Sequence, residues 1–487
     1  MSEATRRFTR GAGWIYAFRG LERCLEFLAI VVLARLLAPE DFGLVAIAAS
    51  YVTIIEGLSQ FDVQKALIRE RREDDPLYDS AWTLSVLRGL LAALVLLAVS
   101  PFVGDVRMAA VLRVLALVPV LDGLANPRFV MFERDLLYSR VALQALAAKV
   151  ASVGLTLAVA FAYRSYWALV LGFVAGSLAR LLLSFVLRPY RPRPSLARFR
   201  EIFAFSGWMS LATMLTTLSM ETDKIIVGRL LGVADAGRYF MTQRIGVLPT
   251  RELVSPLQRI LFPSYSEIAD DRPRLRRVVT ESINVLGSLS LPASVGFALV
   301  AGDFVPLALG ATWAPIVPLL VVLVPYLGVR ATLSMALPCA MALGRTRLLF
   351  QATAVYAPIH LLVFIAGTAW FGLRGAIWSI VLAGVLYTGL NAWILRRTVG
   401  VPAGAALRQL RRPLVAVVAM VGAVALADAA LPVALVGSDA SWLALAVKVG
   451  VGAPVFVAAQ YLLWRREGRP DGLESRLLQL VPRRYRG

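Results

Sequence analysis

The sequence predicts an all-α polytopic membrane protein with about fourteen transmembrane helices, and composition and segment length together predict it. Of the 487 residues, 59% are hydrophobic and 17% are charged, and the mean hydropathy is +0.71. A soluble domain is about 45–50% apolar and about 25% charged. Apolar segments of about 20 residues, long enough to cross a bilayer as a helix, recur along the chain. Soluble, disordered and collagen-like proteins are therefore excluded.

The expected spans follow one another with short connections. They lie near 14–37, 42–64, 81–103, 108–125, 139–162, 166–187, 202–223, 235–258, 278–301, 312–329, 331–343, 348–370, 375–395, 412–432 and 442–464. The stretch 304–343 contains Pro306, Pro315, Pro318 and Pro325. Because proline breaks the helical hydrogen-bond ladder, this stretch predicts one re-entrant piece and one kinked helix instead of two full spans.

The 51 cations predict the orientation of the chain. They occur in short bursts between apolar segments and not as one stripe, so we expect no nucleic-acid partner. With the N-terminus inside, 33 Lys and Arg fall in cytoplasmic segments and 5 fall outside. Cytoplasmic loops are enriched in Lys and Arg. Both termini are therefore expected in the cytoplasm.

An internal repeat divides the chain. Arg35–Gly43 aligns without a gap with Arg229–Gly237 at an offset of 194, and the same offset aligns Trp14 with Trp208. Six spans separate the copies, so both have the same orientation, which is a parallel repeat of the kind found in transporters. The expected parts are an N-lobe with spans 1–6, a C-lobe with spans 7–12, spans 13–14, and a basic cytoplasmic tail, at 1–195, 196–400, 401–465 and 466–487.

Charged side chains inside the expected spans are costly and usually face a wet cavity or one another. In the first span, Arg19, Glu22, Arg23 and Glu26 share one helical face by their spacing. They form either a self-neutralising stripe that packs helices or the lining of a polar passage. The corresponding spans of the second half carry Glu221, Asp223, Lys224, Arg244, Arg251 and Glu252.

Other residues give no support for catalysis. His360 is the only histidine, and a buried, satisfied side chain is its ordinary role. The sequence has no His/Cys metal spacing and no phosphate-binding glycine loop of Walker type. We therefore expect no enzyme, no cofactor and no metal. Single charged residues elsewhere in the spans have no interpretation of their own: Arg88, Asp122, Lys149, Arg180, Arg330, Asp428 and Lys448.

The string FLAIVVLARLLAPEDFGLVAIAASYVTIIEGLSQFDVQKALI, with GRLLGVADAGRY in the second half, resembles the MOP flippase superfamily, and within it the Wzx-type exporters of lipid-linked oligosaccharides. The resemblance is strong over 8–130. It implies two six-helix lobes around a cavity that opens alternately to each side of a bacterial inner membrane. It also implies a flippase that moves undecaprenyl-diphosphate-linked repeat units outward, for O-antigen, capsule or exopolysaccharide.

By the same resemblance, Arg19, Arg23, Arg244 and Arg251 would bind the diphosphate. Glu22, Glu26, Glu221 and Glu252 would be candidates for ion coupling, with Asp223 and Lys224 beside them in the lumen. The implied partners are the polyprenyl-diphosphate-linked oligosaccharide, membrane lipids, and polysaccharide polymerase or export machinery.

Three other functions stay open. A multidrug or small-cation exporter of the same superfamily would need unpaired carboxylates in its cavity. A membrane glycosyltransferase, polymerase or ligase would need a sizeable outer loop with acid and base residues, and the outer loops expected here are short. A scaffold without transport would not need the charged stripe of the first span.

Overall fold

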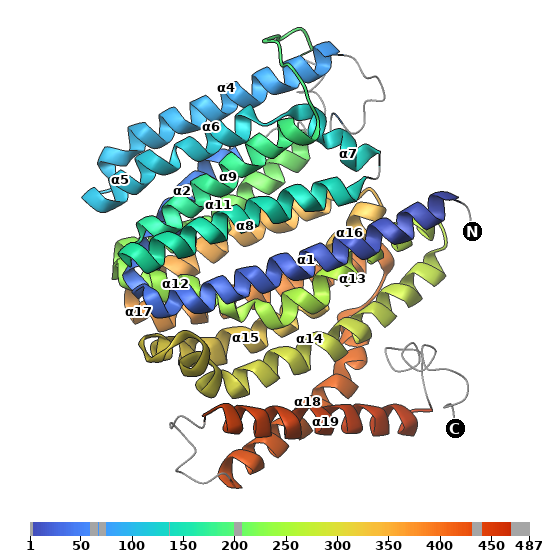
Figure 1. The fold of residues 1–487 in the computed structure, drawn as a ribbon. Coiled ribbons are helices and arrows are strands. Elements are labelled where there is room, and N and C mark those ends of the chain that lie inside the picture. Colours follow the sequence, from blue (N-terminus) through green and yellow to red (C-terminus); the bar gives the residue numbers. More distant parts are fainter. Residues whose placement is uncertain are drawn as a thin grey trace. The chain divides into compact units, whose positions relative to one another are not determined.

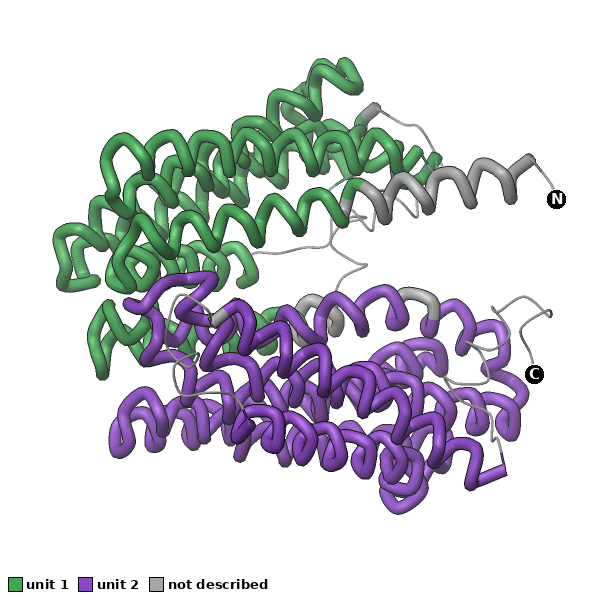
Figure 2. Tube along the Cα trace, turned by 60° about the horizontal axis from the view of Figure 1, so that its bottom comes forward, with its two compact units in different colours: residues 1–237 green, residues 238–487 purple. Residues whose placement is uncertain are grey.

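The computed structural model describes residues 3–58, 67, 75–135, 137–198, 207–430 and 441–468. Every regular element in these ranges is a helix, and no β-strand occurs among them (Figure 1). The expected all-α class is confirmed. Contacts divide the chain into two compact units, Met1–Gly237 and Arg238–Gly487 (Figure 2). The lobe boundary at 195 follows from the sequence repeat, and it stays a prediction.

Unit 1 packs its helices as neighbouring pairs: α8 lies along both α1 and α9, α4 along α6, and α2 along α11. Its helices are α1 (Glu3–Leu36), α2 (Pro39–Leu58), α4 (Asp75–Val99), η1 (Ser100–Phe102), α5 (Val106–Leu115), α6 (Leu117–Leu124), η2 (Pro127–Val130), α7 (Met131–Arg134), α8 (Tyr138–Tyr163), α9 (Trp167–Leu187) and α11 (Gly207–Leu231).

Unit 2 is organised around the long helix α14, which packs against α13, α15, α18 and α19. Its elements are α12 (Val233–Gly246, which begins in unit 1), α13 (Leu248–Glu267), α14 (Arg272–Leu309), η3 (Ala311–Ile316), α15 (Val317–Thr332), α16 (Ala336–Ala342), α17 (Thr346–Val399), α18 (Ala403–Ala430) and α19 (Ser441–Arg466).

The helices agree with a multi-pass membrane protein. Among the described residues, nine helices are long and apolar enough to cross a bilayer, or ten if the bent pair Val106–Leu124 and Pro127–Arg134 is one span. Helix α1, helix α11 and the consecutive pair α12–α13 are also long enough to cross a bilayer, but they carry more charged residues. With these and with α17 taken as two helices, the described segments of spanning length agree with the expected number of about fourteen.

Helix α17 is a hairpin of two helices. It runs for 54 residues, but Gly372 has φ 61° and ψ −145°, a conformation open almost only to glycine. After this turn the chain runs back along itself, because the Ser379 hydroxyl donates to the carbonyl of Val363 at 2.9 Å. The separate spans expected near 348–370 and 375–395 match the two arms.

The proline-rich stretch 304–343 differs from the expectation of a re-entrant piece. Helix α14 continues through Pro292 and Pro306 to Leu309, and Gly310 turns the chain with φ 100°. Residues Ala311–Ala342 then form one candidate span, made of η3, α15 and α16. Pro306 removes one helical hydrogen bond, but α14 ends three residues later at Leu309, so little of the helix lies beyond the interruption.

The segment that connects the two sequence repeats is tied to the start of α4. The Tyr190 hydroxyl donates to Asp79, whose carboxylate also accepts from the backbone N–H of Arg193 at 3.0 Å. The backbone N–H of Ser195 donates to the Thr83 hydroxyl at 2.9 Å. Burial and the Asp79 carboxylate raise the pKa of Tyr190. These bonds fix the connection at the N-terminal end of α4.

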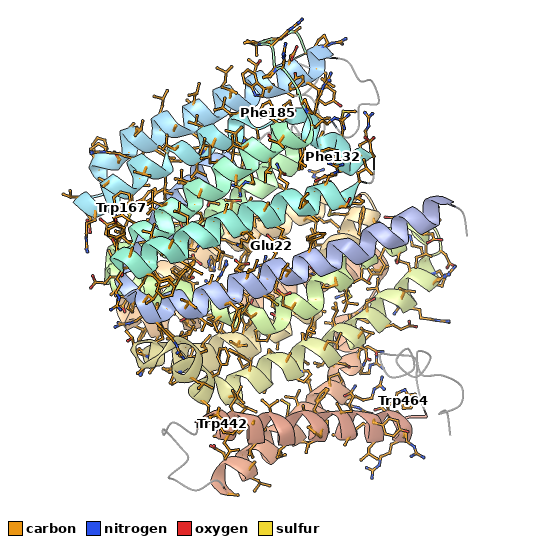
Figure 3. The ribbon with its side chains drawn as sticks, viewed as in Figure 1. Glu22, Phe132, Trp167, Phe185, Trp442 and Trp464 are labelled. Carbon is orange, nitrogen blue, oxygen red and sulfur yellow. The ribbon has the colours of Figure 1, made fainter. Side chains whose placement is uncertain are left out.

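Aromatic residues mark helix ends. Figure 3 shows Trp442 and Trp464 at the two ends of α19. At 1.5 Å per residue they are about 33 Å apart along the helix, close to the hydrocarbon thickness of about 30 Å. Tryptophan is enriched at membrane interfaces, so this spacing agrees with a helix that crosses the bilayer.

Candidate functional site

The two copies of the repeat meet at their turns. A Cβ atom on Gly43 would lie 1.9 Å from the carbonyl oxygen of Val233, and one on Gly237 would lie 1.8 Å from that of Pro39. These contacts are reciprocal, because Val233 corresponds to Pro39 and Gly237 to Gly43 at the offset of 194. The start of α2 and the start of α12 therefore pack around a local two-fold axis, and only glycine fits at both positions.

Helix α2 continues along α11 through a polar contact. The Ser50 hydroxyl donates to Glu221 at 2.8 Å, and Glu221 pairs with Lys224 at 2.7 Å. Asp223, between these two residues in the sequence, is buried with 4% of its surface exposed. Glu221 and Lys224 thus lie at the α2–α11 interface, where they neutralise each other.

The charged face of α1 pairs outside itself. Glu26 forms an ion pair with Lys149 of α8 at 3.5 Å. Glu22, labelled in Figure 3, has no ion pair with any residue that the structure describes. Arg23 is half-buried, and the side chain of Arg19 lies outside the described residues. The stripe is therefore not neutralised wholly within α1, because a cation from α8 takes part.

Unit 1 also contains a charged cluster that the sequence did not reveal. Arg180 of α9 pairs with Asp122 of α6 at 3.2 Å and donates to Ser177 at 2.8 Å. Glu56 of α2 lies close enough to interact electrostatically with Asp122, Arg180 and Arg88 of α4. Two cations and two anions from four helices thus offset one another, and the Arg180 side chain is 48% exposed.

A second charged cluster holds the last two helices of unit 2. Lys448 of α19 pairs with Asp303 of α14 at 2.8 Å and with Asp428 of α18 at 2.6 Å. Gln460 of α19 donates to Ser288 of α14 at 3.1 Å, deep in the same interface. These contacts fasten spans 13 and 14 to α14.

The expected anion-binding cations of the C-lobe lie on consecutive helices. Arg244, on α12, is half-buried, and Arg251, on α13, is exposed. Arg244 and Arg251 are close enough to repel each other electrostatically. Glu252, next to Arg251, is exposed. Two cations held near each other favour an anion with more than one negative charge.

Arg330 differs from the paired cations above in its surroundings, which are aromatic. It lies on α15, and its guanidinium carbon is 4.8 Å from the ring centre of Tyr387, in cation–π contact. The titratable groups beside it are Tyr326, Tyr356 and Tyr387, the last two from the two arms of the α17 hairpin. No carboxylate in the described part of the chain forms an ion pair with Arg330.

The aromatic side chains around Arg330 are themselves firmly packed. Tyr356 contacts Tyr387 at 5.0 Å and stacks on His360 at 5.3 Å between ring centres. His360 in turn contacts Phe364 at 5.7 Å. The only histidine is therefore a buried member of an aromatic row, with 4% of its surface exposed. The row fixes the tyrosines that surround the arginine.

Sequence reasoning missed Arg330 because no neighbour in the sequence gives it a role. One local signal was present: Tyr326 precedes it by four residues and so shares its helical face. The other two tyrosines come from a hairpin far along the chain. By contrast, Arg19, Arg23, Arg244 and Arg251 were singled out through a family resemblance.

The sequence profile of the family described as "Polysaccharide biosynthesis protein" matches residues 32–318, which is more than half of the chain. The chain belongs to this family. Proteins similar to it include lipopolysaccharide biosynthesis protein WzxC of Escherichia coli (strain K12), 24% identical over 80% of this chain and 81% of that protein. Succinoglycan biosynthesis transport protein ExoT of Rhizobium meliloti (strain 1021) is 24% identical over 85% of each chain.

Solved structures show the same fold for this family member. The lipid II flippase MurJ, in an inward closed conformation, has a TM-score of 0.72 at 13% identity, over 93% of this chain and 99% of that one. An inward-facing multidrug resistance MATE transporter of the MOP superfamily has a TM-score of 0.59 at 16% identity, over 80% and 96%. The expected MOP superfamily fold is therefore confirmed.

Proposed function

We propose that this protein flips a polyprenyl-diphosphate-linked oligosaccharide, such as the undecaprenyl-linked repeat unit of a surface polysaccharide, from the inner to the outer leaflet by alternating access. One observation carries the proposal: Arg330 lies in a membrane span beside three tyrosines and without a carboxylate partner among the described residues. A charge in the membrane is costly unless it is paired. A transported anion supplies the missing partner.

Four other cations inside spans differ from Arg330 in this respect. Each of the following has a carboxylate partner at 3.5 Å or less: Lys149, Arg180, Lys224 and Lys448. Such pairs serve packing, because the two charges offset each other. Arg330 has no such pair. It shares a hydrogen bond with Tyr387, and its remaining donors can bind a ligand. Arginine binds phosphate oxygens through two parallel N–H groups.

The remaining site residues keep the roles that the resemblance implies. Arg244 and Arg251 would bind the diphosphate with Arg330, and Arg19 and Arg23 would bind it from the first span. Glu22, Glu26, Glu221 and Glu252 are the carboxylates proposed for ion coupling, beside Asp223 and Lys224. Among these, Glu221 and Glu26 already pair with lysines. Glu22 is therefore the stronger candidate for ion coupling.

The physics of the substrate supports flipping without ATP. The polyprenyl tail can stay in lipid while only the polar head crosses a wet passage. A diphosphate carries about two negative charges, and an interior-negative potential favours the outward movement of each by about 2.3 kcal/mol per 100 mV. The membrane potential alone would thus supply about 4–5 kcal/mol per 100 mV. This energy is enough to drive a useful gradient.

The location follows from the same proposal. The protein would lie in the bacterial inner membrane with both termini in the cytoplasm, as the distribution of Lys and Arg indicates. Its proposed partners are the lipid-linked oligosaccharide, membrane lipids, and the polymerase or export machinery that uses the flipped unit. The names of the relatives, which refer to lipopolysaccharide and succinoglycan biosynthesis, support this class of substrate.

The deciding experiment is the accumulation of undecaprenyl-diphosphate-linked oligosaccharide in a strain that lacks the gene, with the leaflet assigned by a membrane-impermeant probe. Accumulation in the inner leaflet, reversed by the wild-type gene, is expected, and the glycan names the substrate. Normal lipid-linked intermediates together with altered drug tolerance would contradict the proposal and favour the exporter function.

A further inference from the structure

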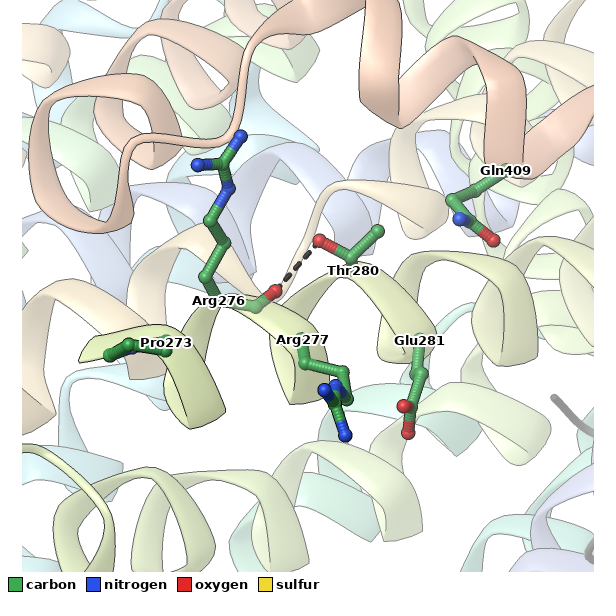
Figure 4. A pocket seen from close by; sticks show the side chains of 6 residues that line it. All are labelled: Pro273, Arg276, Arg277, Thr280, Glu281 and Gln409. Atoms are coloured by element: carbon green, nitrogen blue, oxygen red, sulfur yellow. Dashed lines mark hydrogen bonds between the residues drawn. The ribbon is translucent and has the colours of Figure 1, made fainter. Parts of the chain in front are cut away.

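A pocket lies between the N-terminal end of α14 and α18. It has a volume of about 440 Å³ and is lined by Pro273, Arg276, Arg277, Thr280, Glu281 and Gln409. Figure 4 shows Arg276 and Arg277 on α14, with their guanidinium groups pointing to different sides, and Gln409 on the neighbouring helix α18. The Thr280 hydroxyl is already used, because it donates to the carbonyl of Arg276 at 2.7 Å.

The pocket contains hydrogen-bond donors that nothing in the described chain uses. The side chains of Arg276, Arg277 and Gln409 form no hydrogen bond or ion pair with any described residue. Nearby arginines have structural partners instead: Arg272 donates to the carbonyl of Thr398 at 3.2 Å, and Arg412 pairs with Glu467 at 3.3 Å. Two free guanidinium groups against one carboxylate, Glu281, leave the pocket net positive.

The depth of the pocket identifies the zone of the membrane in which it lies. No charged residue occurs between Glu281 and Asp303 on α14, a stretch of 21 residues. At 1.5 Å per residue this stretch is about 31 Å long, which matches the hydrocarbon core of about 30 Å. The helix residues before Glu281, which line the pocket, therefore lie in the headgroup layer. Basic pockets between helices at this level bind acidic lipid headgroups.

We propose that this pocket binds the phosphodiester headgroup of an anionic phospholipid, such as phosphatidylglycerol, from the leaflet at the N-terminal end of α14. Arg276 and Arg277 contact the phosphate oxygens, and the Gln409 amide donates to the glycerol or phosphate oxygens. The acyl chains lie along the apolar surface of α14 and α18. None of the proposed diphosphate-binding residues lines the pocket, and the proposal does not depend on the identity of the transported lipid.

The test uses the full chain in detergent, titrated with short-chain phosphatidylglycerol and followed by native mass spectrometry. The wild type should bind one phosphatidylglycerol in preference to phosphatidylethanolamine. The R276Q/R277Q variant should bind it about tenfold more weakly, a loss of about 1.4 kcal/mol. The control R274Q/R347Q also removes two positive charges, but from exposed residues that do not line the pocket, and it should bind phosphatidylglycerol like the wild type.

Three results would overturn the proposal. Equal weakening in the control would show general attraction to a basic surface. Displacement by inorganic phosphate at equal concentration would show a simple anion site, and displacement only by undecaprenyl diphosphate would show an entry site for the transported lipid. If R276Q/R277Q does not fold, the milder Q409L should weaken phosphatidylglycerol binding while keeping the unfolding temperature, and unchanged binding would also count against the site.

Discussion

At the scale of single residues, an arginine in a span that has no carboxylate partner among the described residues indicates an anion-binding site. The guanidinium group of Arg330 is surrounded by tyrosine rings and hydroxyl groups, which stabilise a cation without neutralising it. Such an environment keeps the site positive when it is empty, and it keeps a fixed geometry because the α17 hairpin holds two of the tyrosines.

Arg330 gives the first prediction. Replacing it with alanine removes charge-assisted hydrogen bonds worth about 1.5–3 kcal/mol, so polymer export should fall by about 10-fold to 100-fold. Arg330→Lys should keep part of the activity, because it retains the charge but not the planar pair of donors. The measurement is surface polysaccharide at matched expression. The control is Arg374→Ala, an exposed arginine beside the α17 turn, and export that survives Arg330→Ala in full would exclude the role.

Arg251 gives a related prediction with a different structural reason. This side chain is exposed and repels Arg244, so its removal should not destabilise the fold. Arg251→Ala should abolish export at normal expression while the unfolding temperature stays at the wild-type value, and Arg251→Lys should restore part of the export. A variant that exports normally would show that the diphosphate is bound elsewhere.

At the scale of elements, glycines set the distance between helices. At the meeting of α2 and α12, Gly43 and Gly237 each face a backbone carbonyl of the other repeat copy. A backbone atom cannot move aside as a side chain can. The contact therefore fixes how closely the two repeat copies approach at this end of the bundle.

Gly43→Ala should lower the free energy of unfolding by about 3 kcal/mol, the upper end of the range typical of overpacking. Gly154→Ala on α8 is the matched control, because a Cβ atom there would have nothing within 4 Å. Alanine is favoured over glycine in a helix by about 1 kcal/mol, so the control should be neutral or stabilising. The unfolding temperatures of the two purified variants measure the difference. Equal unfolding temperatures would contradict the close packing of Gly43 against the Val233 carbonyl.

Helices α18 and α19 give another prediction at this scale. Lys448→Met leaves Asp303 with 11% of its side chain exposed and without its cation, and breaking a buried ion pair costs about 3–5 kcal/mol. The triple variant D303N/D428N/K448M removes all three charges and should recover most of that stability. Thermal unfolding of both variants tests this, and a triple variant no better than Lys448→Met would argue against the charge cluster as the cause.

The elements themselves were predictable because their signals are local. Each span is a run of apolar residues, and the arms of α17 were expected near 348–370 and 375–395 even though the helix is continuous apart from Gly372. The pairs Glu26–Lys149 and Asp303–Lys448 were not predictable, because their partners are far apart in the sequence. Charged residues that are scattered along the sequence, such as Asp122 and Arg180, lie together in the packed helices.

At the scale of the whole molecule, the repeat and the distribution of charge are the two properties that organise the chain. The repeat could be found because nine residues at each turn keep the positions of Arg, Asp and Gly, and the structure shows why the glycines are needed. The excess of Lys and Arg at alternate expected connections predicts an orientation that no contact within the molecule can reveal.

The orientation gives the last prediction. In a background with C24S and C339A, Val106→Cys should react with a membrane-impermeant maleimide in intact cells, because it follows the third expected span and is 86% exposed. Asp270→Cys, exposed between α13 and α14, should react only after the membrane is opened. The two positions report opposite faces with similar access to solvent, so each controls for the reactivity of the other. The reverse pattern would show that the orientation is opposite to the expected one, with the positive connections outside. The N-terminal side, from which the substrate is proposed to start, would then face outward, and the membrane potential would oppose movement of the diphosphate from that side to the other.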